Sequence, residues 1–223
     1  MGSYAAMVKS MDGSIGTIVA ALEELNLTDE TIIVFTSDNG GLTTLPPRRE
    51  APTAGLPLRA GKGWLYEGGI RVPLIVKWPG GISTGQVSSL SVSGVDIFPT
   101  LGGLVGMKDR EAQIDGIDLS AYLLENKEPL TRNLYWHFPH YHGSGSLPSA
   151  AIRSGDYKLI HWYETGRNEL YDLSVDLSET TDLSEKNKGI RDSLYRSLVS
   201  WQEEVGAHLP KPNPAFEIQE SKK

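Results

Sequence analysis

The sequence contains no cysteine among its 223 residues. This absence excludes disulfide bonds, thiolate metal sites and a cysteine nucleophile within the chain. The sequence also lacks any block of lysine or arginine, and its formal net charge is −7. Because nucleic-acid binding needs a concentrated basic surface, we expect no nucleic-acid partner.

Long apolar runs are missing as well. No uninterrupted apolar stretch approaches the roughly 18 residues of a membrane-spanning helix, and the N-terminus lacks the basic-then-apolar order of a signal peptide. We therefore predict no membrane span and no membrane partner. Hydrophobic residues still make up 39% of the chain, which is enough for a packed core.

The first half of the chain shows helix and strand patterns in turn. Apolar residues recur every three or four positions over 4–27, which predicts an amphipathic helix with one buried face. A β-branched and aromatic run over 31–36 predicts a strand covered on both faces. A proline- and glycine-rich loop over 40–61 follows. Further strands are predicted at 72–78 and 87–92, and helices at 96–105 and 118–125.

The pattern changes after residue 129. Four short strand-like runs are separated by turns that contain glycine or aspartate, which is typical of an antiparallel meander. They lie at 133–138, 150–153, 157–163 and 169–173. An apolar period over 190–205 predicts a helix packed on this sheet. We place the domain boundary near 125–129, which divides the chain into 1–126 and 127–223.

Asp38 and Asn39 directly follow the first predicted strand. In an open α/β sheet, ligands bind beyond the carboxyl ends of the strands. Both side chains offer hard oxygen atoms that suit calcium or magnesium. The alternative is an ordinary tight turn, because Asn-Gly is a common turn dipeptide. Calcium takes about six to eight oxygens, so further ligands must come from elsewhere.

Lys62 lies between Gly61 and Gly63, where little side-chain bulk shields its ammonium from an anion. The spacing of the surrounding glycines does not fit a phosphate-binding loop or a dinucleotide-binding motif. An exposed loop lysine without a ligand is the alternative. Glu67 could act as a general acid, but in a glycine-flanked turn we favour a role in anchoring loop amides.

Three histidines gather in the segment "YWHFPHYHGSG": His137, His140 and His142. A zinc site is conceivable, but no carboxylate or cysteine completes a ligand set at a recognisable spacing. Histidines that pack or lie at the surface are the alternative.

The order of these motifs resembles the C-terminal half of a sulfatase of the arylsulfatase type, in the alkaline-phosphatase-like superfamily. The segments that carry the resemblance are "IIVFTSDNGG", "GKGWLYEGGIRVPLIVKWPG", "VDIFPTL", "IDGIDL", "AIRSGDYKLI" and "NELYDLSVDLSETTDL". The resemblance implies an α/β fold in which the C-terminal portion of an alkaline-phosphatase-like sheet precedes a small antiparallel sheet and a C-terminal helix. It implies hydrolysis of sulfate esters, plausibly on carbohydrates.

The resemblance also implies roles for single residues. Asp38 and Asn39 match metal ligands, usually for Ca2+, and Lys62 matches the catalytic lysine that binds the sulfate group. His137 or His140 would contact a sugar or the sulfate near the substrate entrance. Members of this family are commonly periplasmic, secreted or lysosomal, and the localisation of this chain stays open.

One part of the family pattern is missing from the chain. Sulfatases are about twice as long, and their first half carries an aspartate pair and a Cys- or Ser-x-Pro-Ser/Ala-Arg segment whose first residue becomes formylglycine. The nearest match, at 146–150, lacks the arginine. We therefore expect a sulfatase fragment that is inactive alone and that tends to self-associate through exposed apolar surface. A two-metal phosphatase or phosphodiesterase and a non-catalytic binding module are the alternatives.

Overall fold

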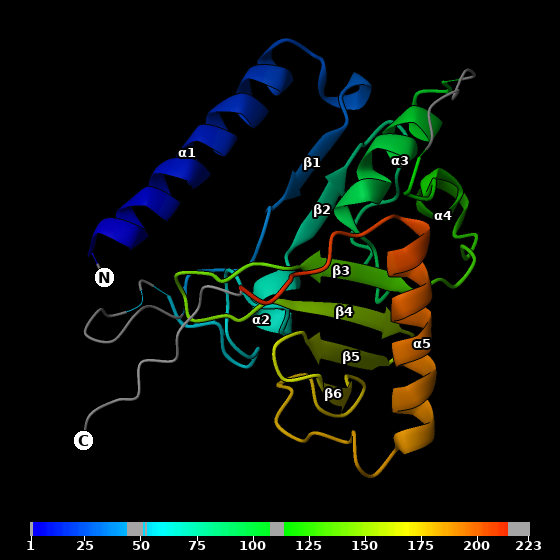
Figure 1. The fold of residues 1–223 in the computed structure, drawn as a ribbon. Helices are drawn as coiled ribbons and strands as arrows, with labels where there is room; N and C mark the ends of the chain where they lie inside the picture. Colours follow the sequence, from blue (N-terminus) through cyan, green and yellow to red (C-terminus); the bar gives the residue numbers. More distant parts are fainter. Residues whose placement is uncertain (1, 44–50, 52, 108–113, 214–223) are drawn as a thin grey trace.

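The computed structural model describes residues 2–43, 51, 53–107 and 114–213 (Figure 1). Residues 44–50 and 52 of the expected long loop lie outside these ranges. Figure 1 shows a long helix and a small two-stranded sheet beside a larger four-stranded sheet that carries the C-terminal helix.

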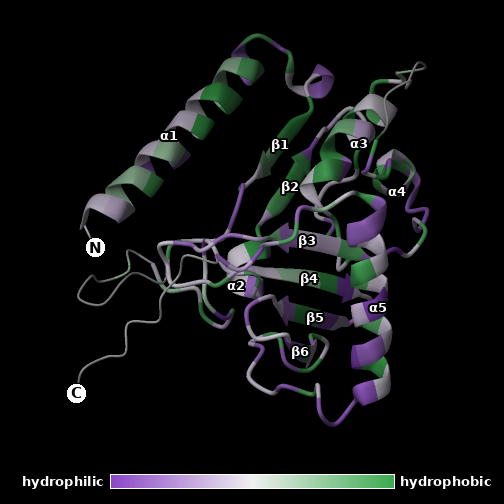
Figure 2. Cartoon of the chain, viewed as in Figure 1, coloured by the Kyte–Doolittle hydropathy of each residue, from purple (hydrophilic) through white to green (hydrophobic). Residues whose placement is uncertain are grey.

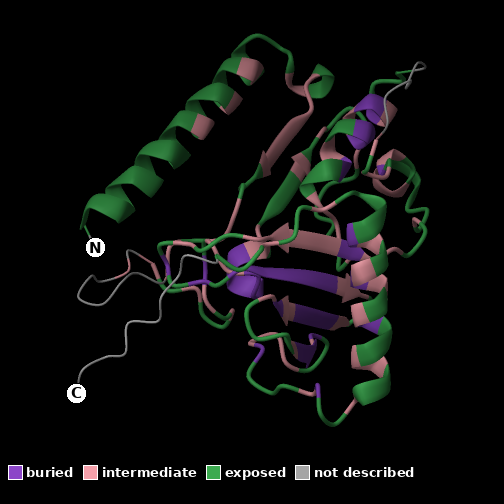
Figure 3. Ribbon diagram, in the orientation of Figure 1, coloured by how far each residue is buried: buried purple, intermediate pink, exposed green. Residues whose placement is uncertain are grey.

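The first helix, α1, spans Gly2–Glu24, followed by the short η1 at Thr28–Glu30. The helix forms as predicted, but the expected buried face is wrong, because none of its residues is buried. Figure 3 shows α1 exposed along almost its whole length. Only Ile15, Val19 and Leu22 are partly covered. Within the described residues no other element buries the apolar positions of α1. Figure 2 shows hydrophobic positions spread along this helix.

The prediction that no segment approaches a membrane span is also corrected. Helix α1 is long and apolar enough to cross a membrane by length and composition alone. Small residues between the larger apolar ones interrupt any continuous run but keep the mean hydropathy high. A core helix of a folded domain passes the same test, so the composition of α1 does not establish a membrane segment.

Strands β1 (Ile33–Thr36) and β2 (Leu74–Lys77) form a two-stranded antiparallel sheet. The expected burial of β1 on both faces is wrong, since its residues are only partly covered. In this register Thr36 lies opposite Leu74. The residues that follow β1 therefore lie beside the residues that precede β2, and this arrangement brings 37–41 to the segment around α2 (Glu67–Ile70).

The connection to the second sheet contains η2 (Gly94–Asp96), α3 (Ile97–Leu104) and α4 (Ser120–Glu125), in agreement with the two predicted helices. The predicted strand at 87–92 is wrong. There the Ser88 hydroxyl accepts the amide of Leu90 at 3.0 Å, a local bond that competes with strand pairing.

The predicted meander is confirmed. Strands β3 (Leu134–Phe138), β4 (Ser149–Ser154), β5 (Tyr157–Trp162) and β6 (Arg167–Asp172) pair in sequence order, each antiparallel to the next. The final helix, α5, spans Lys188–Glu204 and covers one face of the sheet.

Apolar residues alternate between the two faces of this sheet. Toward α5, Ile152, Leu159 and Leu170 pack with Leu194 and Leu198. On the opposite face, the sheet packs against the segment that precedes β2, in a cluster formed by Leu65, Tyr66, Ala151, Ile160, Trp162, Tyr171 and Leu173. The second sheet is thus a platform for the segment that carries Lys62. The division at residue 126 stays a prediction, and this cluster contains residues from both sides of it.

Candidate active site

Two backbone hydrogen bonds join the turn after β1 to the segment before β2. The amide of Gly40 donates to the carbonyl of Gly69, and the amide of Lys62 donates to the carbonyl of Gly41, each at 2.9 Å. The structure thus brings the backbone that carries Asp38 and Asn39 together with the backbone that carries Lys62.

The glycines allow this close approach. A Cβ atom at Gly40 would lie 1.7 Å from the carbonyl oxygen of Gly68, and one at Gly61 would lie 2.2 Å from that of Gly41. Asn39 and Gly40 do not form a hairpin turn, because the partner strand β2 begins only at Leu74. Gly40 is therefore required for contact between two segments far apart in the sequence.

Asp38 and Asn39 present oxygen atoms at the end of β1. Asp38 is exposed, and its Oδ1 accepts the amide of Asn39 at 3.0 Å. The side-chain amide of Asn39 donates to the carbonyl of Gly40 at 2.9 Å, which leaves its Oδ1 to face another group. These donors suit calcium by type. Among the described residues, no three His, Cys, Asp or Glu side chains are grouped to hold a metal ion.

Lys62 is exposed, and a histidine lies against the turn that carries it. A Cβ atom at Gly63, whose φ is +88°, would lie 2.1 Å from Nδ1 of His142. His142 Nδ1 also lies 2.8 Å from the Ser144 hydroxyl. No sequence feature distinguishes His142 from the other two histidines of its segment.

The two histidines singled out from the sequence lie in different surroundings. His140 is exposed and packs edge-on against Phe138, with ring centroids 5.6 Å apart. Phe138 also contacts the ring of His142 at 6.2 Å. In His137, Nδ1 lies 2.7 Å from the Tyr163 hydroxyl and Nε2 lies 3.2 Å from the His208 carbonyl. His137 thus contacts the residue that follows β5 through Nδ1 and the segment after α5 through Nε2.

Glu67 begins α2 and is 2% exposed. Its carboxylate accepts hydrogen bonds from Lys158 at 2.9 Å and from Arg71 at 3.2 Å. Burial favours a higher pKa for Glu67, but the charge and hydrogen bond of Lys158, together with Arg153 and Arg71, hold this pKa below its ordinary value. The favoured role in anchoring loop amides belongs instead to Glu179, whose Oε2 accepts the amide of Glu67 at 2.6 Å.

The serine segment at 146–150 does not supply a nucleophile. Ser146 is 1% exposed and Ser149 is fully buried, between β3 and the start of β4. The Ser146 hydroxyl donates to the carbonyl of Leu147 at 3.3 Å. A side chain enclosed in this way cannot reach a sulfate ester.

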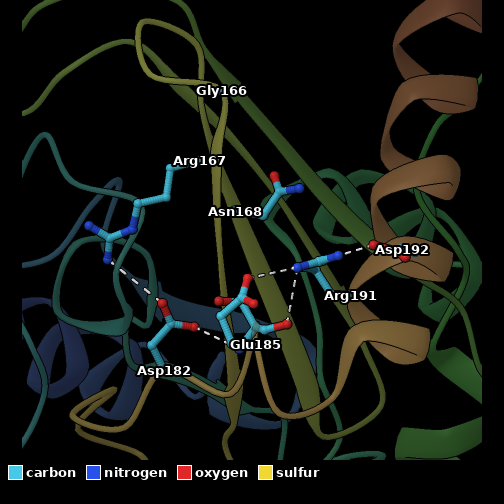
Figure 4. A pocket seen from close by; sticks show the side chains of 8 residues that line it. Gly166, Arg167, Asn168, Asp182, Glu185, Arg191 and Asp192 are labelled. Carbon is cyan, nitrogen blue, oxygen red and sulfur yellow. Dashed lines mark hydrogen bonds and ion pairs between the residues drawn. The ribbon is translucent and has the colours of Figure 1, made fainter.

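A hollow of about 480 Å³ lies elsewhere, between the start of β6 and the start of α5 (Figure 4). Its two arginines already face carboxylates: Arg167 lies 3.7 Å from Asp182, and Arg191 lies 3.0 Å from Glu185. Because both arginines already lie against carboxylates, we assign the hollow no part in the candidate active site.

Solved structures identify the class of fold. The chain aligns with Ps i-CgsB in complex with k-i-k-neocarrahexaose at a TM-score of 0.76 and 33% identity, over 89% of this chain and 42% of that chain. It aligns with BT4656 in complex with D-glucosamine-2-N,6-O-disulfate at a TM-score of 0.72 and 25% identity, over 89% of this chain and 39% of that one. The architecture is that of the alkaline-phosphatase-like hydrolases.

Family profiles then identify the family. The profile described as "Sulfatase" matches residues 1–107, and the profile described as "N-sulphoglucosamine sulphohydrolase, C-terminal" matches residues 60–204. The chain belongs to the sulfatase family.

Curated relatives agree with this assignment. A "Sulfatase" of Formosa agariphila is 37% identical over 203 residues, which cover 82% of this chain and 35% of that protein. Human "Arylsulfatase A" is 36% identical over 223 residues, which cover 90% of this chain and 43% of that protein. The chain therefore spans less than half the length of these two relatives.

Proposed function

We propose that this chain supplies one part of the active site of a sulfatase that hydrolyses sulfate esters on carbohydrates. The observation that supports the proposal is the pair of backbone hydrogen bonds that joins the turn carrying Asp38 and Asn39 to the segment carrying Lys62. Cleavage of a sulfate ester builds negative charge on the sulfuryl oxygens. A fixed ammonium group stabilises that charge.

In this proposal Lys62 binds the sulfate group, and Asp38 and Asn39 are ligands of Ca2+. When bound, the ion would supply additional positive charge at the sulfate oxygens. The donor types fit calcium, and the remaining ligands come from outside the described residues. The formylglycine nucleophile of the family likewise lies outside this chain, which has no cysteine and no accessible candidate serine.

Two aligned structures support a carbohydrate substrate, because they contain k-i-k-neocarrahexaose and D-glucosamine-2-N,6-O-disulfate. His140 suits a substrate contact, since it is exposed and shares Phe138 with His142 at the Lys62 turn. A substrate contact by His137 stays a prediction. It would require His137 to break its contact with either the Tyr163 hydroxyl or the His208 carbonyl.

Binding measured by NMR tests the proposal directly. Sodium sulfate added to the 15N-labelled chain should shift the amide signal of Lys62, and Lys62→Ala should abolish the response of its neighbours. Calcium chloride should shift the signals of Asp38 and Asn39, and magnesium chloride serves as the comparison. Unchanged spectra with both salts would overturn the assignment of these residues.

The proposal also includes inactivity of the chain alone. A pure sample incubated with an aryl sulfate should release no product above the blank, because the nucleophile is outside the chain. Robust turnover that is lost in Lys62→Ala would show that the chain forms a complete active site.

A further inference from the structure

A buried charge cluster holds the segment that carries Lys62 on the four-stranded sheet. The cluster consists of Glu67, Lys158 and Glu179, which are 2%, 0% and 0% exposed. The Lys158 ammonium lies 2.9 Å from Glu67 Oε1 and 2.9 Å from Glu179 Oε1. The second contact is an ion pair without hydrogen-bond geometry. The three residues come from the start of α2, from β5 and from the loop after β6.

Glu179 holds this segment at two points, on either side of Lys62. Its carboxylate accepts the amide of Glu67 at 2.6 Å, and its backbone carbonyl accepts the guanidinium of Arg59 at 2.7 Å. Arg59 also lies over the ring of Tyr66, 3.8 Å from the ring centroid. Lys62 lies between these two anchor points in the sequence.

The backbone of Glu179 has φ +53°, which is uncommon for a residue other than glycine. Such a conformation persists when surrounding contacts over-determine it, and it is found most often at functional positions. Here the contacts are the carboxylate and carbonyl bonds to the Lys62 segment.

One ammonium, that of Lys158, attracts both carboxylates of the cluster, and burial opposes the ionisation of each. Burial raises the pKa of Glu179, and the attraction of Lys158 offsets only part of that effect. The pKa of Glu67 is held below its ordinary value, because Lys158, together with Arg153 and Arg71, outweighs burial there. Apolar side chains of similar volume often replace buried ion pairs without loss of stability. This cluster therefore points to a need for directional contacts, which apolar packing does not provide.

We propose that Glu67, Lys158 and Glu179 are positioning residues for Lys62. They fix Arg59 and Glu67 on the sheet. The turn between these two residues then holds the Lys62 ammonium beside the turn that carries Asp38 and Asn39. This inference rests on the proposed function only for what Lys62 binds. The mechanical part, fixation of the segment, can be measured without any ligand.

Hydrogen exchange at single amides tests the positioning role. Lys158→Met keeps the length of the side chain and removes its charge. In this variant the amides of Gly40 and Lys62, which join the two segments, and the amide of Gly68, which donates to the carbonyl of Arg59, should exchange at least about tenfold faster. The amides of Ile152 and Leu159, in the strands that face α5, measure the loss of global stability in the same variant, and the first three amides should accelerate at least about tenfold more than these two. A purely structural role would accelerate all five amides alike and would overturn the proposal.

Two further variants complete the test. Lys188→Met makes the same change in an exposed ion pair with Glu185 and should leave all five rates unchanged. Glu179→Gln retains an acceptor for the amide of Glu67 and provides a milder variant if Lys158→Met does not fold. It should accelerate the same three amides to a smaller degree, and unchanged rates in a folded variant would contradict the proposal.

A titration with sodium sulfate separates this inference from the proposed function. In the wild-type chain sulfate should shift the Lys62 signal, and Lys158→Met should weaken this binding by about tenfold or more. If sulfate does not shift the Lys62 signal of the wild-type chain, the proposed function fails. The exchange rates still decide the positioning role. If Lys158→Met binds sulfate as well as the wild type does, the positioning role fails.

Discussion

The amide of Gly40 donates to the carbonyl of Gly69 at 2.9 Å. This bond crosses the open end of the β1–β2 pair, where the residues after one strand meet the residues before the other. The candidate active site is thus built on contact between two backbones. Its geometry depends on the absence of side chains at the point of contact.

Gly40→Ala should disrupt this contact. The added methyl group would lie 1.7 Å from the carbonyl oxygen of Gly68, so one of the two segments must move. We expect a loss of about 1–3 kcal/mol in the free energy of unfolding, measured by urea denaturation. Gly16→Ala is the matched control, since a Cβ there meets no atom within 4 Å and lies in helix α1. The control should gain up to about 1 kcal/mol. Equal stability of both variants would contradict the interpretation.

Helix α1 should cause self-association of the chain. Met7 and Ile18 are 68% and 60% exposed on this helix, and Leu25, directly after it, is 65% exposed. Apolar surface of this kind favours association in water. Light scattering should show a mass that rises with concentration. The double variant Met7→Glu and Ile18→Glu should lower this mass.

Ser193→Glu provides the control for that experiment, because it adds a charge to an exposed position of α5. It should leave the association unchanged. A monodisperse monomer of the wild-type chain would contradict the prediction. Sedimentation with lipid vesicles, lost in the double variant, would instead assign the helix to a membrane surface.

His161 should titrate below the ordinary pKa of a histidine. Burial lowers the pKa of His161, and the hydrogen bond between its Nδ1 and Asn168 Oδ1, at 2.7 Å, offsets only part of this effect. The folded state therefore binds fewer protons than the unfolded state just below the ordinary histidine pKa of about 6.5. The stability that this histidine contributes is present above that pH and is lost as the pH falls through it.

An NMR titration of the five histidine rings checks this prediction. His161 should have a pKa below about 6.5. Asn168→Ala removes the bond that raises the pKa and should lower it further. A midpoint at or above 6.5 in the wild-type chain would show that burial does not dominate at this ring.

Much of the fold could be predicted because local patterns specify it. The meander and the helices α3, α4 and α5 follow from the spacing of apolar residues and from the turn residues between them. Burial of α1 and β1 could not be predicted, because an apolar pattern shows that a face needs a partner and does not show whether the chain contains one. The strand expected at 87–92 failed because a serine side chain satisfies the backbone there.

Part of the candidate site could be predicted from the sequence. Asp38, Asn39 and Lys62 stand out by their glycine neighbours, and the glycines prove to be points of backbone contact. The role of Lys158 could not be read, because a lysine between apolar residues of a strand normally faces solvent. Only the register of β5 with β6, in which Lys158 lies opposite Tyr171, places it toward the Lys62 segment.

Lys158→Met should make the stability of the chain depend on pH in a defined direction. In the wild type Lys158 attracts both Glu67 and Glu179, and burial opposes the ionisation of both. Without the ammonium, we expect the pKa of each carboxyl to rise in the folded state. The folded variant then binds more protons than the unfolded chain above the ordinary glutamate pKa of about 4.3, so its stability falls as the pH rises.

Urea denaturation at several pH values between about 5 and 8 measures this effect. The loss of stability relative to the wild type should be smallest near pH 5 and should reach about 3–5 kcal/mol near pH 8, the usual result of leaving a buried charge unpaired. Lys188→Met, in an exposed ion pair, should lose little at any pH. At low pH, protonation of a buried carboxyl removes the cost of its unpaired charge. A loss of stability that is constant across this range would therefore show that other groups stabilise the two carboxylates. The charge of Lys158 would then not be what holds Glu67 and Glu179 together.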